Sequence, residues 1–487
     1  MSEPSAPRFL GDIPIDAARA ALLQAAELAC EYLEKGAAYR VLPEIAPGDV
    51  RKALPPSPPL EAEPLAAILR DYQALIEPNV THWNHPGFMA YFATSGSAAG
   101  IVGEMLCAAL NVNAMVWRSG PAPTELETLA CDWLRQMLDL PAEFEGHIND
   151  TASMSSLLAL AAARERAAPQ TRTRGLAGTR PLTVYASEHA HSSIDKAAIT
   201  LGIGLENVRR VAADDAFELR VDALADALRA DRAAGLLPIA VVSTVGTTGP
   251  GSIDPTPAIA ELCRAQGLWL HVDAAHAGSA GICPEYRALM PGLALADSLV
   301  VNPHKWLFTP MDCSVLLLRD PHVLRAAFAV TPEYLRTRES GVVNLMDYGP
   351  QLGRRFRALK LWMTLRAFGV RGLQQRIRYH CALARELAGW IAEDPRFELA
   401  APAPLSLVCF RAVPDRPPEA QDGFNERLLE RVNATGRVFL SHTKLNGRYV
   451  IRVAIGNLRT AEADVRTVWQ AIRQAFEDES AAYRAAP

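Results

Sequence analysis

The chain has few of the features that mark membrane or secreted proteins. No uninterrupted apolar run approaches the length of a membrane-spanning helix. The first residues, Met1-Ser2-Glu3-Pro4-Ser5-Ala6-Pro7, carry neither the basic segment nor the apolar core of a secretion signal. We therefore expect a cytoplasmic protein that has no membrane partner.

Cysteine pairs and an excess of positive charge are also missing. The 8 cysteines form no CxxC pair and no regular framework, which is typical of reduced, mostly buried thiols. The net charge is -5, and the densest basic cluster, residues 354–360, lies within an apolar helical pattern. A basic cluster of this size more often helps to pack a helix or binds one anion than it binds double-stranded nucleic acid. We therefore expect no nucleic-acid partner.

The chain does contain enough apolar sequence for a large core. Hydrophobic residues make up 49% of the 487 positions and charged residues 21%, which favours a folded enzyme over a disordered chain. This length suggests about three domains, or one large domain with appendages.

The first part of the chain, residues 1–97, is helical in pattern. Its amphipathic stretches, 17–33 and 60–76, are separated by the proline-rich residues 54–59. A helical pair of this kind has little core of its own. We expect it to fold against something else.

The rest of the chain mixes strands and helices. Residues 98–372 alternate apolar strands with helical patterns, which predicts a mainly parallel sheet with ligands at the carboxyl ends of its strands. The expected strands are 181–186, 238–245, 268–272, 298–301 and 314–318. Residues 373–487 predict a small α/β domain with strands at 405–410 and 449–454.

Two motifs place an amine and a carboxylate just after such strands. Lys305 lies in the motif Asn302 to Trp306, and Asp273 ends the run Leu270-His271-Val272-Asp273. A lysine can hold the aldehyde of pyridoxal phosphate as a Schiff base, and a carboxylate can keep the pyridine nitrogen protonated. The alternative is two unrelated charged residues at loop starts, which is common when one motif stands alone.

A phosphate-binding turn is indicated by Thr151, Ala152 and Ser153. These residues directly precede an apolar helical pattern, so hydroxyls and unpaired amides meet at a helix start. Thr151 or Ser153 can equally be an ordinary helix N-cap, and both interpretations can hold together.

The histidines allow two further interpretations. His191 taken alone is more often a surface or core residue than a functional one, although it follows a predicted strand and precedes a helix. His271, Asp273, His276 and His304 can also be interpreted as a metal cluster, but their spacing matches no zinc signature.

Taken together and in this order, the motifs resemble the group II pyridoxal-phosphate decarboxylases, and within them the aromatic L-amino acid decarboxylases. The resemblance runs from about residue 10 to about residue 475. The matching segments are 83–86, 91–94, 123–127, 190–193, 270–279, 302–306 and 352–357.

The resemblance implies PLP fold type I, the aspartate aminotransferase-like α/β fold. Residues 1–97 would form a helical dimerisation segment, 98–372 a large PLP-binding domain and 373–487 a small C-terminal domain. It also implies an obligate homodimer with active sites at the interface.

The resemblance further implies pyridoxal 5'-phosphate as cofactor, with His191 stacked on its ring and Ala275 packed flat against it. The expected cofactor contacts are Thr151, Ala152, Ser153, His191, Thr247, Asp273, Ala275, Asn302, His304 and Lys305. The family often has glycine and serine where this chain has Asp150 and Thr151. We therefore expect Asp150 to turn away from the phosphate.

The catalytic residues implied by the resemblance are Lys305, Tyr334, His191, Asp273 and His304. Tyr334 lies in a polar stretch and matches a loop tyrosine that donates a proton to the substrate α-carbon after carbon dioxide leaves. His304 is a second candidate for this step. Aldehyde-forming relatives resemble this family but carry asparagine at the position of His191 in insects, or phenylalanine at that of Tyr334 in plants.

The resemblance also implies a substrate pocket. Its expected residues are Trp83, Tyr91, Phe92, Thr94, Asn113, Met115 and Gly353, with Asn113 and Met115 reaching in from the partner subunit. Aromatic side chains favour an aromatic substrate, and Gly353 leaves space where certain relatives have serine. Asn113 and Met115 replace the family's aliphatic residue and phenylalanine, and His276 replaces its tyrosine.

We therefore expect decarboxylation of phenylalanine, tyrosine, dihydroxyphenylalanine or tryptophan to the arylalkylamine, through a Lys305 aldimine and a quinonoid carbanion. An aromatic acetaldehyde synthase is the nearest alternative. A catalytically silent cofactor-binding homologue is disfavoured because Lys305, Asp273, His191 and Tyr334 are all present.

Overall fold

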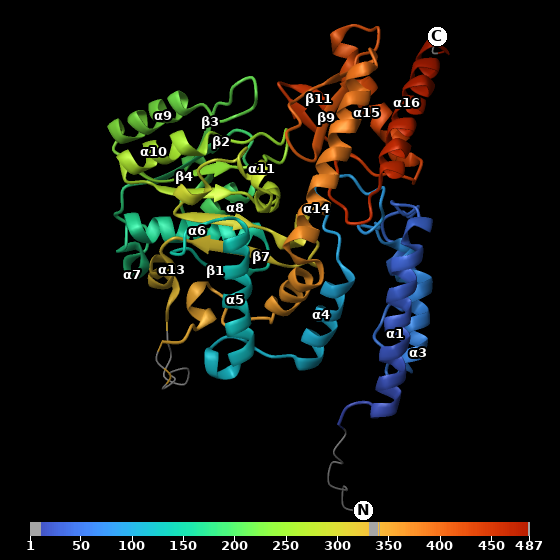
Figure 1. Ribbon diagram of the computed structural model, residues 1–487, viewed down its shortest axis with the longest axis horizontal. Coiled ribbons are helices and arrows are strands. Elements are labelled where there is room, and N and C mark those ends of the chain that lie inside the picture. The colour runs from blue at the N-terminus through green and yellow to red at the C-terminus, as the bar shows by residue number, and fades with distance from the viewer. Residues whose placement is uncertain (1–10, 331–338, 340, 486–487) are drawn as a thin grey trace, which may run out of the picture.

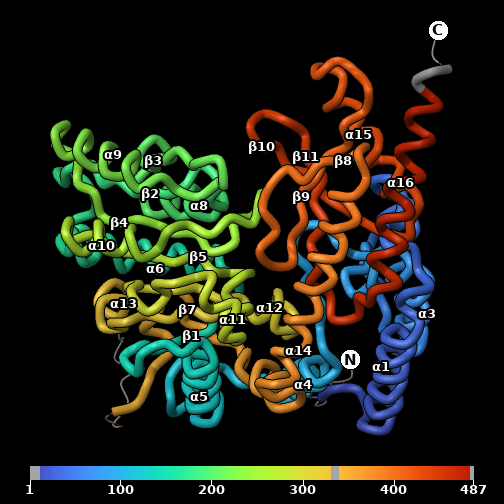
Figure 2. The backbone as a smooth tube through the Cα atoms, turned by 45° about the horizontal axis from the view of Figure 1, so that its top comes forward, coloured from blue at the N-terminus to red at the C-terminus, as the bar shows by residue number. Residues whose placement is uncertain are grey.

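The computed structural model describes residues 11–330, 339 and 341–485 (Figure 1). The N-terminal part is helical, with α1 (Ile15–Lys35), α2 (Asp49–Ala53) and α3 (Leu65–Asp71). Helices α1 and α3 lie side by side and stand beside the rest of the molecule (Figures 1 and 2). The helix predicted at 17–33 is confirmed. No residue of α1 is buried, and its apolar side chains Ile15, Leu22 and Leu23 are exposed.

A seven-stranded sheet forms the centre of the molecule, in the order β1-β7-β6-β5-β4-β2-β3. Its strands are β1 (Glu145–Asn149), β2 (Leu182–Ser187), β3 (Val208–Val211), β4 (Leu237–Thr244), β5 (Trp269–Asp273), β6 (Ser298–Val301) and β7 (Ser314–Leu318). Neighbours from β3 to β6 run parallel, whereas β7 runs antiparallel to both β6 and β1. The mainly parallel sheet is confirmed.

Helices cover both faces of this sheet because successive strand residues point to opposite sides. Val241 of β4 packs with α5 (Pro121–Met137), α9 (Val221–Ala233) and α10 (Thr256–Gln266) in one apolar cluster. The next residue, Val242, packs in a second cluster with α6 (Ala152–Ala167), α8 (Ser193–Thr200) and α13 (Pro321–Phe328). Apolar side chains of the helices therefore cover both faces of the sheet and exclude water from them. The short helices α7 (Thr171–Arg174), α11 (Pro284–Arg287) and α12 (Pro303–Trp306) lie in connections.

The long helix α14 (Ala358–Glu393) joins the sheet to the C-terminal part (Figure 2). It bends at Gly369, whose φ of 61° and ψ of 166° are readily adopted only by glycine. The C-terminal part has an antiparallel sheet in the order β10-β11-β9-β8. Its elements are β8 (Phe397–Leu399), β9 (Leu407–Ala412), α15 (Pro418–Ala434), β10 (Ser441–Leu445), β11 (Arg448–Ala454) and α16 (Glu462–Ala485). The domain boundary predicted at 372 falls within α14, close to this bend, and stays a prediction.

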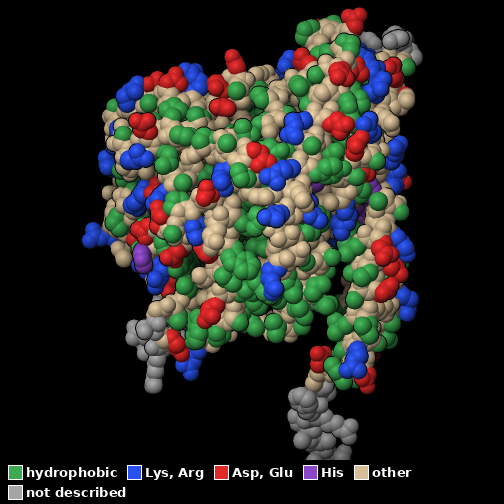
Figure 3. All heavy atoms as spheres, viewed as in Figure 1, with side chains coloured by type: hydrophobic (Ala, Val, Ile, Leu, Met, Phe, Trp, Pro, Cys, Tyr) green, Lys and Arg blue, Asp and Glu red, His purple; other side chains and the backbone are tan. Residues whose placement is uncertain are grey.

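Helix α4 (Ala98–Leu110) packs against the first part of α14. Gly103 permits the approach, because a Cβ there would lie 2.7 Å from the Cα of Lys360. The opposite side of α4 carries exposed apolar side chains. These are Val102, Met105, Leu106 and Leu110. Figure 3 shows apolar side chains gathered over this part of the molecule.

All 8 cysteines are unpaired and all but Cys30 are buried, as predicted. Among the described residues, no helix is both long and apolar enough to cross a membrane.

A buried ion pair ties α5 and β1 to the segment before α14. Glu127 Oε1 accepts hydrogen bonds from Arg354 Nη2 at 2.7 Å and from the Ile148 amide at 2.8 Å. Burial raises the pKa of Glu127, and the charge of Arg354 opposes that rise. The backbone N–H of Arg354 in turn donates a hydrogen bond to Asn113 Oδ1 at 2.9 Å and so holds the Asn113 side chain in place.

We predict that Glu127→Ala lowers the free energy of unfolding by about 3–5 kcal/mol, because it leaves the guanidinium of Arg354 buried without its counter-charge. The midpoint of urea unfolding measures this loss. The double variant Glu127→Leu/Arg354→Met removes both charges and should recover most of it. A single variant as stable as the wild type would contradict the prediction.

Candidate active site

A cavity of about 540 Å³ lies at the carboxyl edge of the central sheet. This volume is within the range of small-molecule and cofactor sites. Of the residues predicted from sequence, the cavity brings together Trp83, Tyr91, Phe92, Thr94, Thr151, Ala152, Ser153, His191, Asp273, Ala275, Asn302, His304 and Lys305. The parallel strands deliver most of the polar groups, because Asp273 ends β5, His191 follows β2 and Lys305 follows β6 on α12.

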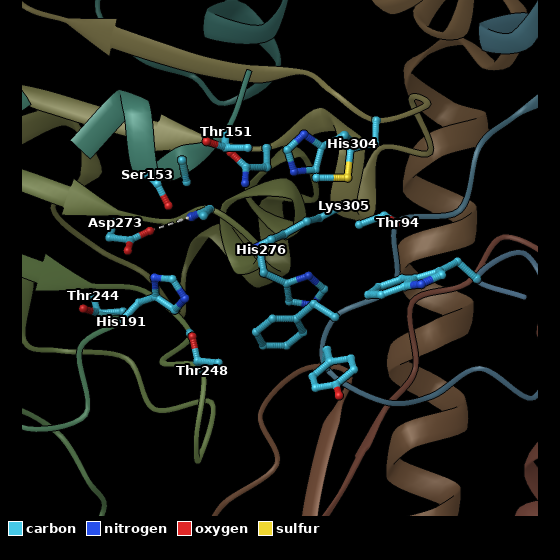
Figure 4. Close-up of a pocket in the computed structure, with 18 residues that line it drawn as sticks. Thr94, Thr151, Ser153, His191, Thr244, Thr248, Asp273, His276, His304 and Lys305 are labelled. Carbon is cyan, nitrogen blue, oxygen red and sulfur yellow. Dashed lines mark hydrogen bonds between the residues drawn. The ribbon is translucent and has the colours of Figure 1, made fainter. Parts of the chain in front are cut away.

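Lys305 reaches into the middle of this cavity, between Asp273 and Thr94 (Figure 4). Its surroundings exclude water and lower the pKa of its amine, while the charge of Asp273 works in the opposite direction. A lowered pKa increases the fraction of neutral amine, which is the form that attacks an aldehyde.

Asp273 is buried at the end of β5, and its Oδ1 accepts a hydrogen bond from the Ala275 amide at 3.1 Å (Figure 4). This bond fixes the direction of the carboxylate and places the short side chain of Ala275 beside it. The pair can therefore present a negative charge and a flat apolar surface to one ligand.

Two of the histidines predicted from sequence line the cavity as neutral rings. His304 is buried, and burial together with the charge of Lys305 lowers its pKa to about 3. Its Nδ1 accepts the Cys313 amide at 2.9 Å, so its proton resides on Nε2. His191 accepts the Ser193 amide at 3.1 Å through Nδ1, and burial lowers its pKa, opposed by Asp273.

The predicted phosphate turn stands at the N-terminus of α6. Thr151 occupies the N-cap position, but its side chain makes no capping hydrogen bond. Its hydroxyl and its amide instead donate to Asp150 Oδ1, at 3.1 Å and 2.5 Å. Asp150 does not line the cavity, although its carboxylate holds one of the amides that a phosphate would use.

Thr247 takes a different position from the other predicted contacts. It is fully buried, and its Oγ1 hydrogen-bonds to the Ser252 hydroxyl at 2.7 Å and accepts the Ser252 amide at 3.0 Å. Its neighbours Gly246 and Thr248 line the cavity instead. The role of Thr247 as a cofactor contact stays a prediction.

Aromatic side chains form one wall of the cavity. Trp83 and Tyr91 stack with ring centroids 6.0 Å apart, and the ring of Phe92 lies 5.5 Å from the Lys305 Nζ. An amine and an aromatic wall therefore share one space. This arrangement suits a substrate that combines an amino group with an aromatic ring.

Three predicted substrate residues lie together elsewhere. Asn113 Nδ2 donates to Met115 Sδ at 3.6 Å, and Asn113 Oδ1 accepts the amide that follows Gly353. Asn113 and Gly353 are exposed, and none of the three lines the cavity of this chain. Tyr334, the predicted proton donor, lies outside the described residues.

The lining also contains Thr244, Gly246, Thr248 and Met311, which were not predicted from sequence. His276, noted above as a replacement for the family's tyrosine, lines the cavity as well. Thr244 could have been found, because it lies near the carboxyl end of the strand predicted at 238–245. The metal interpretation gains no support. His271 is buried against Ser298 Oγ at 2.9 Å, and the described residues contain no group of three or more His, Cys, Asp or Glu side chains that could hold a metal ion.

These groups fit pyridoxal phosphate. An amine of lowered pKa, a buried carboxylate and a helix start that carries the hydroxyls of Thr151 and Ser153 line the same cavity. The buried Oδ1 of Asn302 has no hydrogen-bond partner in the described part of the chain, and a polar ligand would supply one.

Comparison with known proteins agrees with this fit. Residues 47–413 match the pyridoxal-dependent decarboxylase conserved domain. The chain is 40% identical to tryptophan decarboxylase 2 of Oryza sativa subsp. japonica over 460 residues, covering 92% of each chain. It is 41% identical to phenylacetaldehyde synthase of Arabidopsis thaliana over 448 residues, covering 90% of this chain and 91% of that one.

The fold has close counterparts among solved structures. The crystal structure of Oryza sativa tryptophan decarboxylase with PLP and tryptamine superposes with a TM-score of 0.94 at 37% identity, covering 96% of this chain and 99% of that one. The two-sheet architecture is therefore that of PLP fold type I, as predicted. The chain belongs to the group II pyridoxal-dependent decarboxylase family and is a PLP-dependent carboxy-lyase.

Proposed function

We propose that this enzyme decarboxylates an aromatic L-amino acid of the phenylalanine, tyrosine, dihydroxyphenylalanine and tryptophan class to the arylalkylamine and carbon dioxide. The observation that carries the proposal is the wall of Trp83, Tyr91 and Phe92 in the same cavity as Lys305. Relatives named for tryptophan and tyrosine decarboxylation support the same class.

Pyridoxal phosphate, when bound, supplies an electron sink for the electron pair that departing carbon dioxide leaves on the α-carbon. Lys305 would hold its aldehyde carbon, and Asp273 would hold the proton on its pyridine nitrogen. The hydroxyls and amides at the start of α6 would hold its phosphate. The lowered pKa of Lys305 and the fixed carboxylate of Asp273 support these assignments.

Two of this chain's residues are proposed to handle the proton that replaces carbon dioxide. Tyr334 is the proposed donor to the α-carbon. His304 is the alternative donor, because its neutral ring carries a proton on Nε2 and lines the cavity beside Lys305. The aromatic wall would orient the substrate and keep water from its α-carbon.

Analysis of products tests the function. The cofactor-loaded enzyme is incubated in air with a panel of L-amino acids, and amine, aldehyde, carbon dioxide, ammonia and hydrogen peroxide are measured. Amine with an equal amount of carbon dioxide from an aromatic substrate is the expected result. Products from aliphatic or acidic amino acids alone would overturn the substrate class.

An aromatic acetaldehyde synthase is the second candidate, favoured by the 41% identity to phenylacetaldehyde synthase. We predict that the wild type yields amine and that Tyr334→Phe shifts most of the product to aldehyde, ammonia and peroxide. The reason is that the α-carbon, once its proposed proton donor is removed, would react with oxygen instead. Aldehyde as the main product of the wild type would instead favour the synthase.

Asp150 gives a prediction about cofactor affinity. Its carboxylate stands beside the proposed phosphate turn and holds the Thr151 amide at 2.5 Å. Asp150→Ser should remove like-charge repulsion, free that amide, and tighten pyridoxal phosphate binding about fivefold to tenfold. Absorbance titration of the apoenzyme measures the dissociation constant. Asp478→Ser, on α16, is the matched control, and weaker binding by Asp150→Ser would show that the carboxylate supports the turn instead.

We also propose that the enzyme is an obligate homodimer with active sites at the interface. The exposed apolar faces of α1 and α4 support a covering subunit (Figure 3). Asn113, Met115 and Gly353 would then complete the partner's cavity. The exposure of Asn113 and Gly353 in one chain supports this arrangement.

A further inference from the structure

His276 is a buried side chain whose two ring nitrogens are unpaired. It is 6% exposed and lines the cavity that contains Lys305. Neither Nδ1 nor Nε2 has a hydrogen-bond partner in the described part of the chain. Buried polar atoms are normally paired, so this ring requires an explanation that ordinary core packing does not provide.

Neighbouring rings hold the imidazole in one orientation. Phe92 stacks on it with centroids 3.8 Å apart and planes 15° apart, and Trp306 lies on it at 4.8 Å and 7°. Trp306 is itself fixed, because its Nε1 donates to His380 Nδ1 at 2.9 Å. The His276 ring is thus sandwiched and has little freedom to turn its nitrogens toward another protein group.

The ring is also neutral. Burial lowers the pKa of His276 well below its ordinary value, and the positive charges of Lys305 and Arg452 lower it further. A neutral imidazole has one N–H donor and one acceptor nitrogen. It can therefore pair with a hydroxyl through either nitrogen, or with an indole N–H through the acceptor alone.

The ring lies next to the wall proposed to receive the substrate's aromatic group. Phe92 belongs to that wall and contacts His276 directly, and Figure 4 shows His276 on the cavity beside Lys305. A substrate ring without a polar group would leave the two nitrogens unpaired, which is unfavourable. A ring with a hydrogen-bonding group would pair with one of them.

We propose that His276 is a specificity-determining residue that selects substrates whose aromatic ring carries a hydrogen-bonding group, a phenolic hydroxyl or an indole N–H, over phenylalanine. The proposal rests on the proposed function, since it specifies which aromatic amino acids that site prefers. Sites built to pair a substrate hydroxyl discriminate strongly against the analogue that lacks it.

The test compares the wild type with His276→Phe, which keeps a ring between Phe92 and Trp306 but removes both nitrogens. We expect the ratio of kcat/KM for tyrosine over phenylalanine to fall about tenfold, with the change in KM more than in kcat. The ratio of kcat/KM for tryptophan over phenylalanine measures the contribution of the indole N–H separately. His276→Asn, which restores a donor and an acceptor, should recover part of the lost ratio.

A binding measurement supplies a readout independent of turnover. Calorimetric titration of the cofactor-loaded protein with tyramine and with phenethylamine should show a preference for tyramine that His276→Phe loses. His442→Phe is the matched control, because His442 also stacks on an aromatic ring, that of Tyr449 at 4.7 Å, but lies in β10 outside the cavity. The absorbance of the bound cofactor in each variant shows whether the variant still binds pyridoxal phosphate.

The outcomes separate the two proposals. Ratios that do not change in His276→Phe would overturn the role of His276 while leaving an aromatic decarboxylase in place. A wild type that acts on no aromatic amino acid would overturn the proposed function, and the role of His276 with it.

Discussion

Lys305→Ala is expected to reduce decarboxylation by on the order of 10³-fold or more, because no other amine of lowered pKa stands in the described cavity. The variant should still bind pyridoxal phosphate through Asp273 and the start of α6. Its affinity will be lower because the attachment at the aldehyde carbon is missing.

The attachment itself can be measured directly. After borohydride treatment, mass spectrometry of the wild type should find the cofactor on the peptide that contains Lys305, and Lys305→Ala should carry none there. Lys444→Ala, on the exposed edge of β10, is the matched control and should retain both attachment and activity. Attachment to a different lysine in the wild type would refute the assignment.

Gly353→Trp is expected to abolish most of the activity through the partner subunit. A Cβ at Gly353 meets no atom within 4 Å in its own chain, so the new side chain needs no adjustment there. If Gly353 faces the cavity of a second copy, the indole would fill space intended for substrate. Gly389→Trp is the matched control, because Gly389 is also exposed with nothing within 4 Å, but lies near the far end of α14.

Mixed dimers make this prediction quantitative. Co-expression of Lys305→Ala with Gly353→Trp under two affinity tags gives heterodimers in which one cavity has both a native lysine and a native partner surface. With random pairing, about half of the dimers are heterodimers, and one of the two cavities in each is intact. The mixture should therefore recover about a quarter of the wild-type activity from two nearly inactive variants. No restoration would contradict shared active sites.

The strands that carry the site were predictable because they are buried on both faces. The runs that became β2, β4, β5, β6 and β7 are continuous and apolar, so their ends, and with them Asp273 and Lys305, could be located from sequence. The edge strands β1 and β3 were missed. Glu145–Asn149 and Val208–Val211 are short and polar, as edge positions allow.

Finer features of the site depend on turn geometry and on a second molecule. No periodicity tells which of Gly246, Thr247 and Thr248 faces a cavity, and the structure turns Thr247 inward to Ser252. The replacement of the family's tyrosine by His276 was visible in sequence. That both of its ring nitrogens are unpaired depends on the stacking of Phe92 and Trp306, which sequence does not show. Residues such as Asn113 and Gly353 belong to an arrangement that one chain cannot display.

The reversal of β7 has a consequence for how the lysine is presented. Because β6 and β7 are antiparallel neighbours, with Val301 paired to Val315, the segment that contains α12 is anchored at both ends across one strand spacing. A segment closed at both ends has fewer conformations to lose than one with a free end. The entropy of placing the reactive amine is therefore lost once, when the sheet forms, and need not be lost again at each turnover.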